Sequence, residues 1–174
     1  MSTGTAVTDM AIALRDCLMT ELALRDNPPA ETCLIPGEDG REFLSIGLGE
    51  NKCCDGYAWV RVAGVSPILE AYQTDGESGN CGVLRWRVDY EMGVARCAPW
   101  GDAQSGPSCA EWTAVTVQVL SDAEAMRVAL CCLRPQVESG RIQPAPWVAF
   151  GPNGGCTGGI MGVSIQVDDC GCDN

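Results

Sequence analysis

The chain has 174 residues, of which 46% are hydrophobic and 20% are charged, an ordinary composition for one globular domain. Its 23 acidic and 11 basic residues give a net charge of −12, which repels phosphate backbones and anionic lipid and argues against general nucleic-acid binding. No apolar run approaches the roughly 18–20 residues that span a bilayer, and the N-terminus lacks a basic region ahead of an uninterrupted apolar core. We therefore expect a single domain over residues 1–174, made and kept in a cytosol without contact to a membrane.

The first predicted element is a helix over about residues 5–25, which Pro28 and Pro29 end. Acidic residues lie off its apolar stripe, whose members are spaced by three and four residues. The members of this stripe are Val7, Ala11, Leu14, Leu18 and Leu22.

A sheet is predicted over about residues 31–98. Two short apolar pieces, residues 33–35 and 43–46, flank a turn or loop at 36–40, and at least one of them should be a strand. Residues 57–66 are apolar on both faces apart from Arg61, which favours a strand inside the sheet. Residues 71–80 form a polar connection to the next strand.

Residues 83–96 alternate between apolar and charged side chains, which predicts a long strand with one wet face. Arg85, Arg87, Asp89 and Glu91 fill the odd positions of the first half. At about 3.3 Å per residue the strand would span roughly 40 Å, more than a core of this size needs. The extra length indicates a surface that faces a partner.

A second helix is predicted over about residues 109–133, because an apolar stripe from Trp112 to Leu133 steps by three and four. The Val and Thr content of residues 113–119 also favours a strand, and Ser121 with Glu124 could form a capping box that starts the helix later. A closing hairpin is predicted over about residues 145–168 around a turn at 151–155, followed by a short acidic, cysteine-containing tail at 169–174. The expected fold class is α+β, a mainly antiparallel sheet packed by two helices.

Twelve cysteines are compatible with two interpretations. Most could be small buried thiols, which is the favoured interpretation, or some could pair after the protein leaves a reducing compartment. If residues 57–66 and 83–96 are antiparallel neighbours, Cys53 or Cys54 lies close to Cys97, as a disulfide or as two near thiols. The absence of Cys-x-x-Cys and of histidine argues against a zinc site.

The sequence contains few candidate catalytic residues. Without histidine there is no Ser-His-Asp or Cys-His system. The glycines of residues 47–52 lack a phosphate-loop ending, and the carboxylate pairs Asp89 with Glu91 and Asp168 with Asp169 are more typical of solvated surface. Redox activity of a vicinal cysteine pair is a weak alternative. We expect no catalytic residue, no cofactor site and no metal site, and we expect that the protein is not an enzyme.

Three segments resemble head-to-tail connector proteins of actinobacterial long-tailed phages (siphophages). They are Cys53-Cys54-Asp55-Gly56-Tyr57-Ala58-Trp59-Val60-Arg61-Val62, the strand end Ala95-Arg96-Cys97-Ala98-Pro99, and the run from Trp147 to Gly159. The order of elements also resembles the tail terminator fold, a small α/β subunit of a ring that closes the tail tube. The resemblance covers about residues 6–167 and brings no catalytic residue with it.

The resemblance implies a virion structural protein of the head-tail junction, synthesised in the host bacterial cytoplasm. As a tail terminator it would form a homo-oligomeric ring, expected to be a hexamer, that contacts the tail tube protein and the head connector or stopper protein. DNA would pass through without specific binding, past a net acidic lumen. The alternatives are a head-tail stopper or adaptor subunit or, from another class, a small thiol-dependent redox protein.

Overall fold

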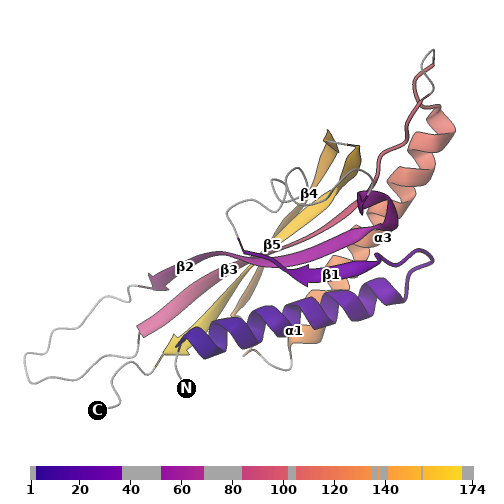
Figure 1. Cartoon of the computed structure of the whole chain (residues 1–174). Helices are drawn as coiled ribbons and strands as arrows, with labels where there is room; N and C mark the ends of the chain where they lie inside the picture. The colour runs from indigo at the N-terminus through magenta and orange to yellow at the C-terminus, as the bar shows by residue number, and fades with distance from the viewer. Residues whose placement is uncertain are drawn as a thin grey trace, which may run out of the picture.

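The computed structural model describes residues 3–36, 52–68, 84–101, 105–134, 137, 141–153 and 155–169. Within these residues two helices pack on a five-stranded sheet of order β1-β2-β3-β5-β4 (Figure 1). β1 runs parallel to β2, and the other three pairs are antiparallel. The predicted α+β class, a mainly antiparallel sheet packed by two helices, is confirmed.

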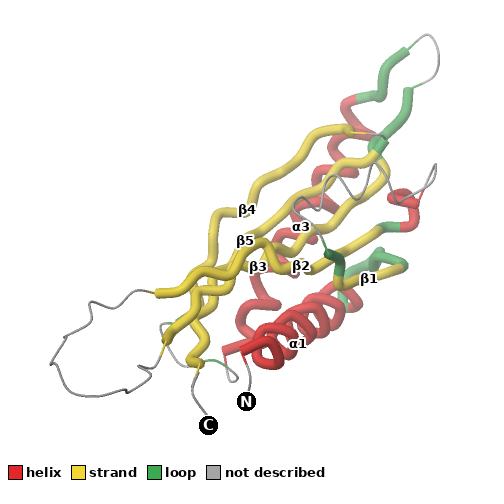
Figure 2. Tube along the Cα trace, turned by 60° about the vertical axis from the view of Figure 1, so that its left-hand side comes forward, coloured by secondary structure: helices red, strands yellow, loops and turns green. Residues whose placement is uncertain are grey.

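In chain order, the described elements are α1 (Thr3–Ala23), β1 (Glu31–Leu34), a 3-10 helix η1 (Lys52–Asp55), β2 (Tyr57–Ile68), β3 (Leu84–Cys97), α3 (Cys109–Leu133), β4 (Ile142–Asn153) and β5 (Cys156–Asp169). Both helices lie on the same face of the sheet, as Figure 2 shows from a second direction.

The helix α1 buries the stripe predicted from the sequence. Ala11, Leu14, Leu18 and Leu22 are all at most 1% exposed, because each faces the sheet or α3. The helix ends at Ala23, before Arg25, and the two boundaries agree within the usual fraying of helix ends.

The helix α3 begins at Cys109 and ends at Leu133, as predicted. Its start is fixed by a capping box: Ser108 N donates to Glu111 Oε2 over 2.7 Å and Glu111 N donates to Ser108 Oγ over 3.3 Å. The alternatives of a strand at residues 113–119 and of a later start at Ser121 are wrong. A capped end and a core-facing stripe outweigh the local β-propensity of Val and Thr.

The long strand β3 is confirmed, but the face predicted to be solvent-exposed is exposed over only half its length. On the face away from the helices, Arg87 is 53% exposed, whereas Glu91 is only 14% exposed. The next position on that face is Gly93, and a Cβ there would overlap the indole of Trp59. Trp59 from β2 therefore covers this half of the open face, which alternation within β3 alone could not show.

The residues of β4 and β5 form the predicted closing hairpin with a tighter turn. The strands continue through Asn153 and resume at Cys156, with Gly155 at φ 81° between them. β5 lies between β3 and β4, so β4 is an edge strand. Pro144, Pro146 and Pro152 lie within β4, where an edge position tolerates their missing N–H groups.

Several predicted features lie outside the described residues. They are the strand at residues 43–46, most of the loop at 36–40, the glycines of 47–51, the connection at 71–80 and the tail at 170–174.

Candidate functional site

A pair of bonded cysteines lies at the end of the sheet where β3 finishes. The register pairs Tyr57 with Ala95, which brings η1 beside the end of β3. Cys54 of η1 and Cys97 of β3 form a disulfide with their Cα atoms 4.1 Å apart. The side chain of Cys53, the other cysteine predicted near Cys97, lies outside the described residues. Cys156, the cross-strand neighbour of Cys97, is also disulfide-bonded.

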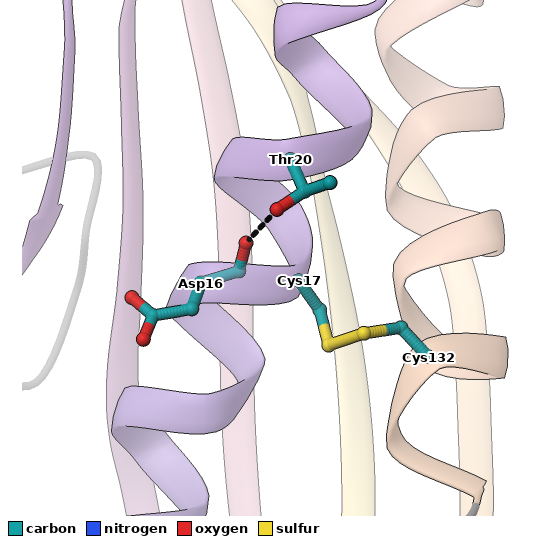
Figure 3. The surroundings of a disulfide bond; sticks show 4 residues. All are labelled: Asp16, Cys17, Thr20 and Cys132. Atoms are coloured by element: carbon teal, nitrogen blue, oxygen red, sulfur yellow. Dashed lines mark hydrogen bonds between the residues drawn. A yellow bond between two sulfur atoms is a disulfide. The ribbon is translucent and has the colours of Figure 1, made fainter.

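A second disulfide joins the two helices. Cys17 of α1 and Cys132 of α3 are 115 positions apart in the sequence, and their Cα atoms are 5.9 Å apart (Figure 3). Cys17 falls three residues after Leu14, so helical spacing alone places this cysteine next to the apolar stripe of α1.

The favoured interpretation of the cysteines as buried thiols is wrong for those that the structure describes. Cys17, Cys54, Cys97, Cys132 and Cys156 are disulfide-bonded. The free cysteines in the described ranges are Cys33, which is half-buried, and Cys109 and Cys131, which are exposed.

A shallow groove of about 390 Å³ runs over the Cys17–Cys132 disulfide between the two helices. Its rim is acidic, with Asp9 and Asp16 from α1. Thr20 Oγ1 donates to the main-chain oxygen of Asp16 over 2.8 Å, which keeps this hydroxyl on the helix (Figure 3). The carboxylate of Asp16 is paired with Arg15 at 2.6 Å.

A pocket of about 300 Å³ lies on the side of α3 that faces β4. Arg127 and Cys131 of α3 and Arg134 at its C-cap line it, together with apolar residues of α3, β4 and β5. Arg127 donates through Nε and Nη2 to Glu124, and this hydrogen bond raises the pKa of Arg127 and lowers that of Glu124. Adjacent cysteines of one helix thus line different cavities, because each residue turns the helix by about 100°.

A buried ion pair joins α3 to the sheet. Arg96 donates through Nε and Nη2 to the carboxylate of Asp122 at 2.8 and 2.7 Å, and both side chains are 3% exposed. The third guanidinium nitrogen of Arg96, Nη1, is buried without a hydrogen-bond partner. On the open face, Glu91 accepts from Arg61 through two bonds of 2.9 Å.

The carboxylates considered for acid-base chemistry have structural partners. Glu91 is held by Arg61, and Asp89 accepts a hydrogen bond from Ser164. The side chains of Asp168 and Asp169 lie outside the described residues. Within the described ranges, no three Cys, Asp or Glu side chains gather closely enough to hold a metal ion.

Large apolar side chains lie on the outer side of the helices. Ile12 and Met19 of α1 are 37% and 49% exposed, and Val117 and Leu120 of α3 are 62% and 55% exposed. Trp100, after β3, and Val148 of β4 are further exposed apolar residues.

Comparison with known proteins identifies no relative: no protein-family model and no curated sequence matches this chain. In the part of the chain that the structure describes, none of the helices has the length and apolar character needed to cross a membrane.

Proposed function

We propose that this chain is a structural protein of a phage virion, located at the head-tail junction. In this proposal it is a tail terminator, a subunit of a ring of six copies that ends growth of the tail tube and docks to the head connector. The proposal is supported by the three segments that resemble connector proteins of siphophages and by the α+β fold with two helices on one face.

The observation that carries most weight is that both helices are apolar on two sides. Ile12 and Met19 lie two turns apart on α1, and Val117 and Leu120 lie one turn apart on α3. A helix of a monomeric protein usually presents one apolar stripe to the core and a polar face to water. Exposed apolar groups on both helices are more typical of a subunit covered by a neighbour. In a ring, such a contact joins two different surfaces of identical subunits.

The edges of the sheet argue against strand-to-strand contact between copies. β4, at one edge, contains three prolines, and β1, at the other edge, has only four residues. Prolines and very short strands at the edges of a sheet prevent continuous pairing with another sheet. We therefore place the contact between copies on the helical side.

Two alternatives remain. A head-tail stopper or adaptor subunit would also form a ring, and the same surface features support it. A thiol-dependent redox protein is favoured by one observation, the exposed free thiol of Cys131 next to the disulfide-bonded Cys132.

Light scattering after size-exclusion chromatography, with negative-stain imaging of the purified protein, tests the ring. If the isolated protein needs its tail tube, the decisive measurement is the density of the virion at the head-tail junction. A junction without this subunit would disprove the proposal. Unlimited tail growth in its absence would distinguish a terminator from a stopper, whose loss leaves tail length unchanged.

The helical contact is tested by replacing Leu120 with Asp, which places a charge in the expected interface. We expect the ring to dissociate while the fold is retained, because Leu120 is 55% exposed. Gln143→Asp, at an exposed position of β4, is the matched control and should leave the ring intact. An intact ring in the Leu120 variant would place the contact elsewhere.

A further inference from the structure

The pocket that Cys131 lines combines a free thiol, an apolar floor and guanidinium groups. Leu130 and Met161 are buried beneath it, 8% and 7% exposed. Ile142, Pro144 and Ala145 of β4 form its wall. A volume of about 300 Å³ is at the lower end of the range for small-molecule sites.

The charge of this pocket has the opposite sign from that of the chain. Arg127 lies four residues before Cys131 and Arg134 three residues after it, so both are on the face of α3 that carries the thiol. Glu124 offsets much of the charge of Arg127, since it accepts two hydrogen bonds from that side chain. Arg134 is exposed, lines the pocket and forms no ion pair with any described residue.

We propose that Cys131 is a site of S-thiolation, at which the protein forms a mixed disulfide with a small anionic disulfide that carries carboxylate groups. The thiolate of Cys131 attacks one sulfur of the reagent, the Cys131–sulfur bond forms, and the sulfur–sulfur bond of the reagent breaks. One half of the reagent stays on the protein, and the other leaves as a thiolate that takes up a proton. The reagent is the oxidant, and no further redox partner is required.

The physical basis is electrostatic and steric. Guanidinium groups bind carboxylates in a fixed, paired geometry, so Arg134 orients the reagent over the thiol. Negative charge spreads over three sulfurs as exchange proceeds, and nearby cations stabilise it. The apolar floor accommodates the methylene groups of the reagent.

Cys109 serves as an internal control for the reactivity of Cys131. Cys109 is also a free, exposed cysteine of α3, but it lies at the capped start of the helix, where the nearby charged group is the carboxylate of Glu111. The two thiols therefore share a helix and differ in the sign of the neighbouring side-chain charge, while the helix dipole, positive at Cys109 and negative at Cys131, acts against that difference.

The experiment exposes the non-reduced protein to glutathione disulfide, which is anionic, and in parallel to cystamine, which is cationic. Peptide mass mapping follows the rate of mixed-disulfide formation at each cysteine. The anionic-to-cationic rate ratio should be at least about fivefold higher at Cys131 than at Cys109, the size expected for one nearby charge in water. Comparing ratios removes the difference in intrinsic reactivity between the two reagents.

Arg134→Gln should lower the anionic-to-cationic rate ratio at Cys131 to the value at Cys109. The thermal unfolding midpoint should not change. The same ratio at both cysteines of the original protein would overturn the proposal. So would a ratio at Cys131 that Arg134→Gln leaves unchanged.

Discussion

Removing the disulfide between the helices should lower stability by an amount that the loop length sets. Replacing both Cys17 and Cys132 with Ser releases a loop whose ends are 115 residues apart in sequence. The chain-entropy relation gives an upper value of about 5 kcal/mol for such a loop, and measured losses are typically about 2–4 kcal/mol. For a domain of this size that corresponds to a decrease in the unfolding midpoint of roughly 10 °C.

The assay is thermal and urea unfolding of the non-reduced protein, followed by circular dichroism. Cys131→Ser is the matched control, since it removes the neighbouring thiol and leaves the disulfide intact. We expect its unfolding midpoint to be unchanged. Reductant should destabilise the original protein by at least as much as the double substitution, because it also opens other disulfides.

Two results would refute this reasoning. One is a loss below about 1 kcal/mol in the double variant, which would mean that the crosslink does not restrict the unfolded chain. The other is recovery of Cys17 and Cys132 as free thiols from the non-reduced purified protein, which would mean that the bond between them does not form.

Three further outcomes are expected. Asp122→Ala should cost about 3–5 kcal/mol in urea unfolding, because it leaves Arg96 charged and buried, and Arg96→Met with Asp122→Leu should recover most of that loss; equal instability of both variants would contradict this. Burial raises the pKa of Tyr90 above the ordinary value of 10.0, so the contribution of Tyr90 to stability should be constant at lower pH and decrease as the pH rises above about 10, and a pH titration of Tyr90→Phe should show a shallower decrease. Fluorescence anisotropy should detect no binding to duplex DNA at physiological salt; salt-sensitive micromolar binding would contradict the acidic-lumen hypothesis.

The sequence predicts those parts of the fold that depend on local chemistry. The range of α3 follows from its apolar stripe, although the capping box that fixes its start is Ser108 with Glu111 and not Ser121 with Glu124. The strands β2 and β3 follow from their alternation and composition. Their antiparallel pairing then places Cys54 next to Cys97, which is a consequence of register alone. Each of these features is determined within a short segment or by two neighbouring strands.

Features that depend on how distant elements pack could not be predicted in this way. The cover over the open face of β3 comes from Trp59 on another strand, and Gly93 leaves room for it. The Cys17–Cys132 bond depends on the relative position of two helices, and connectivity among many cysteines cannot be deduced from sequence. The same holds for the pocket of Cys131, because β4 supplies one wall.

The disulfide restricts the two helices that carry the exposed apolar residues. Met19 of α1 lies two residues after Cys17, so the crosslink restricts the position of this exposed apolar group relative to α3. A surface that is rigid before assembly loses less conformational entropy when a neighbour binds. The net charge of −12 meanwhile keeps separate subunits apart in solution. In the proposed ring, the contact energy of the apolar helix faces must exceed this repulsion, so higher salt should favour assembly by screening it.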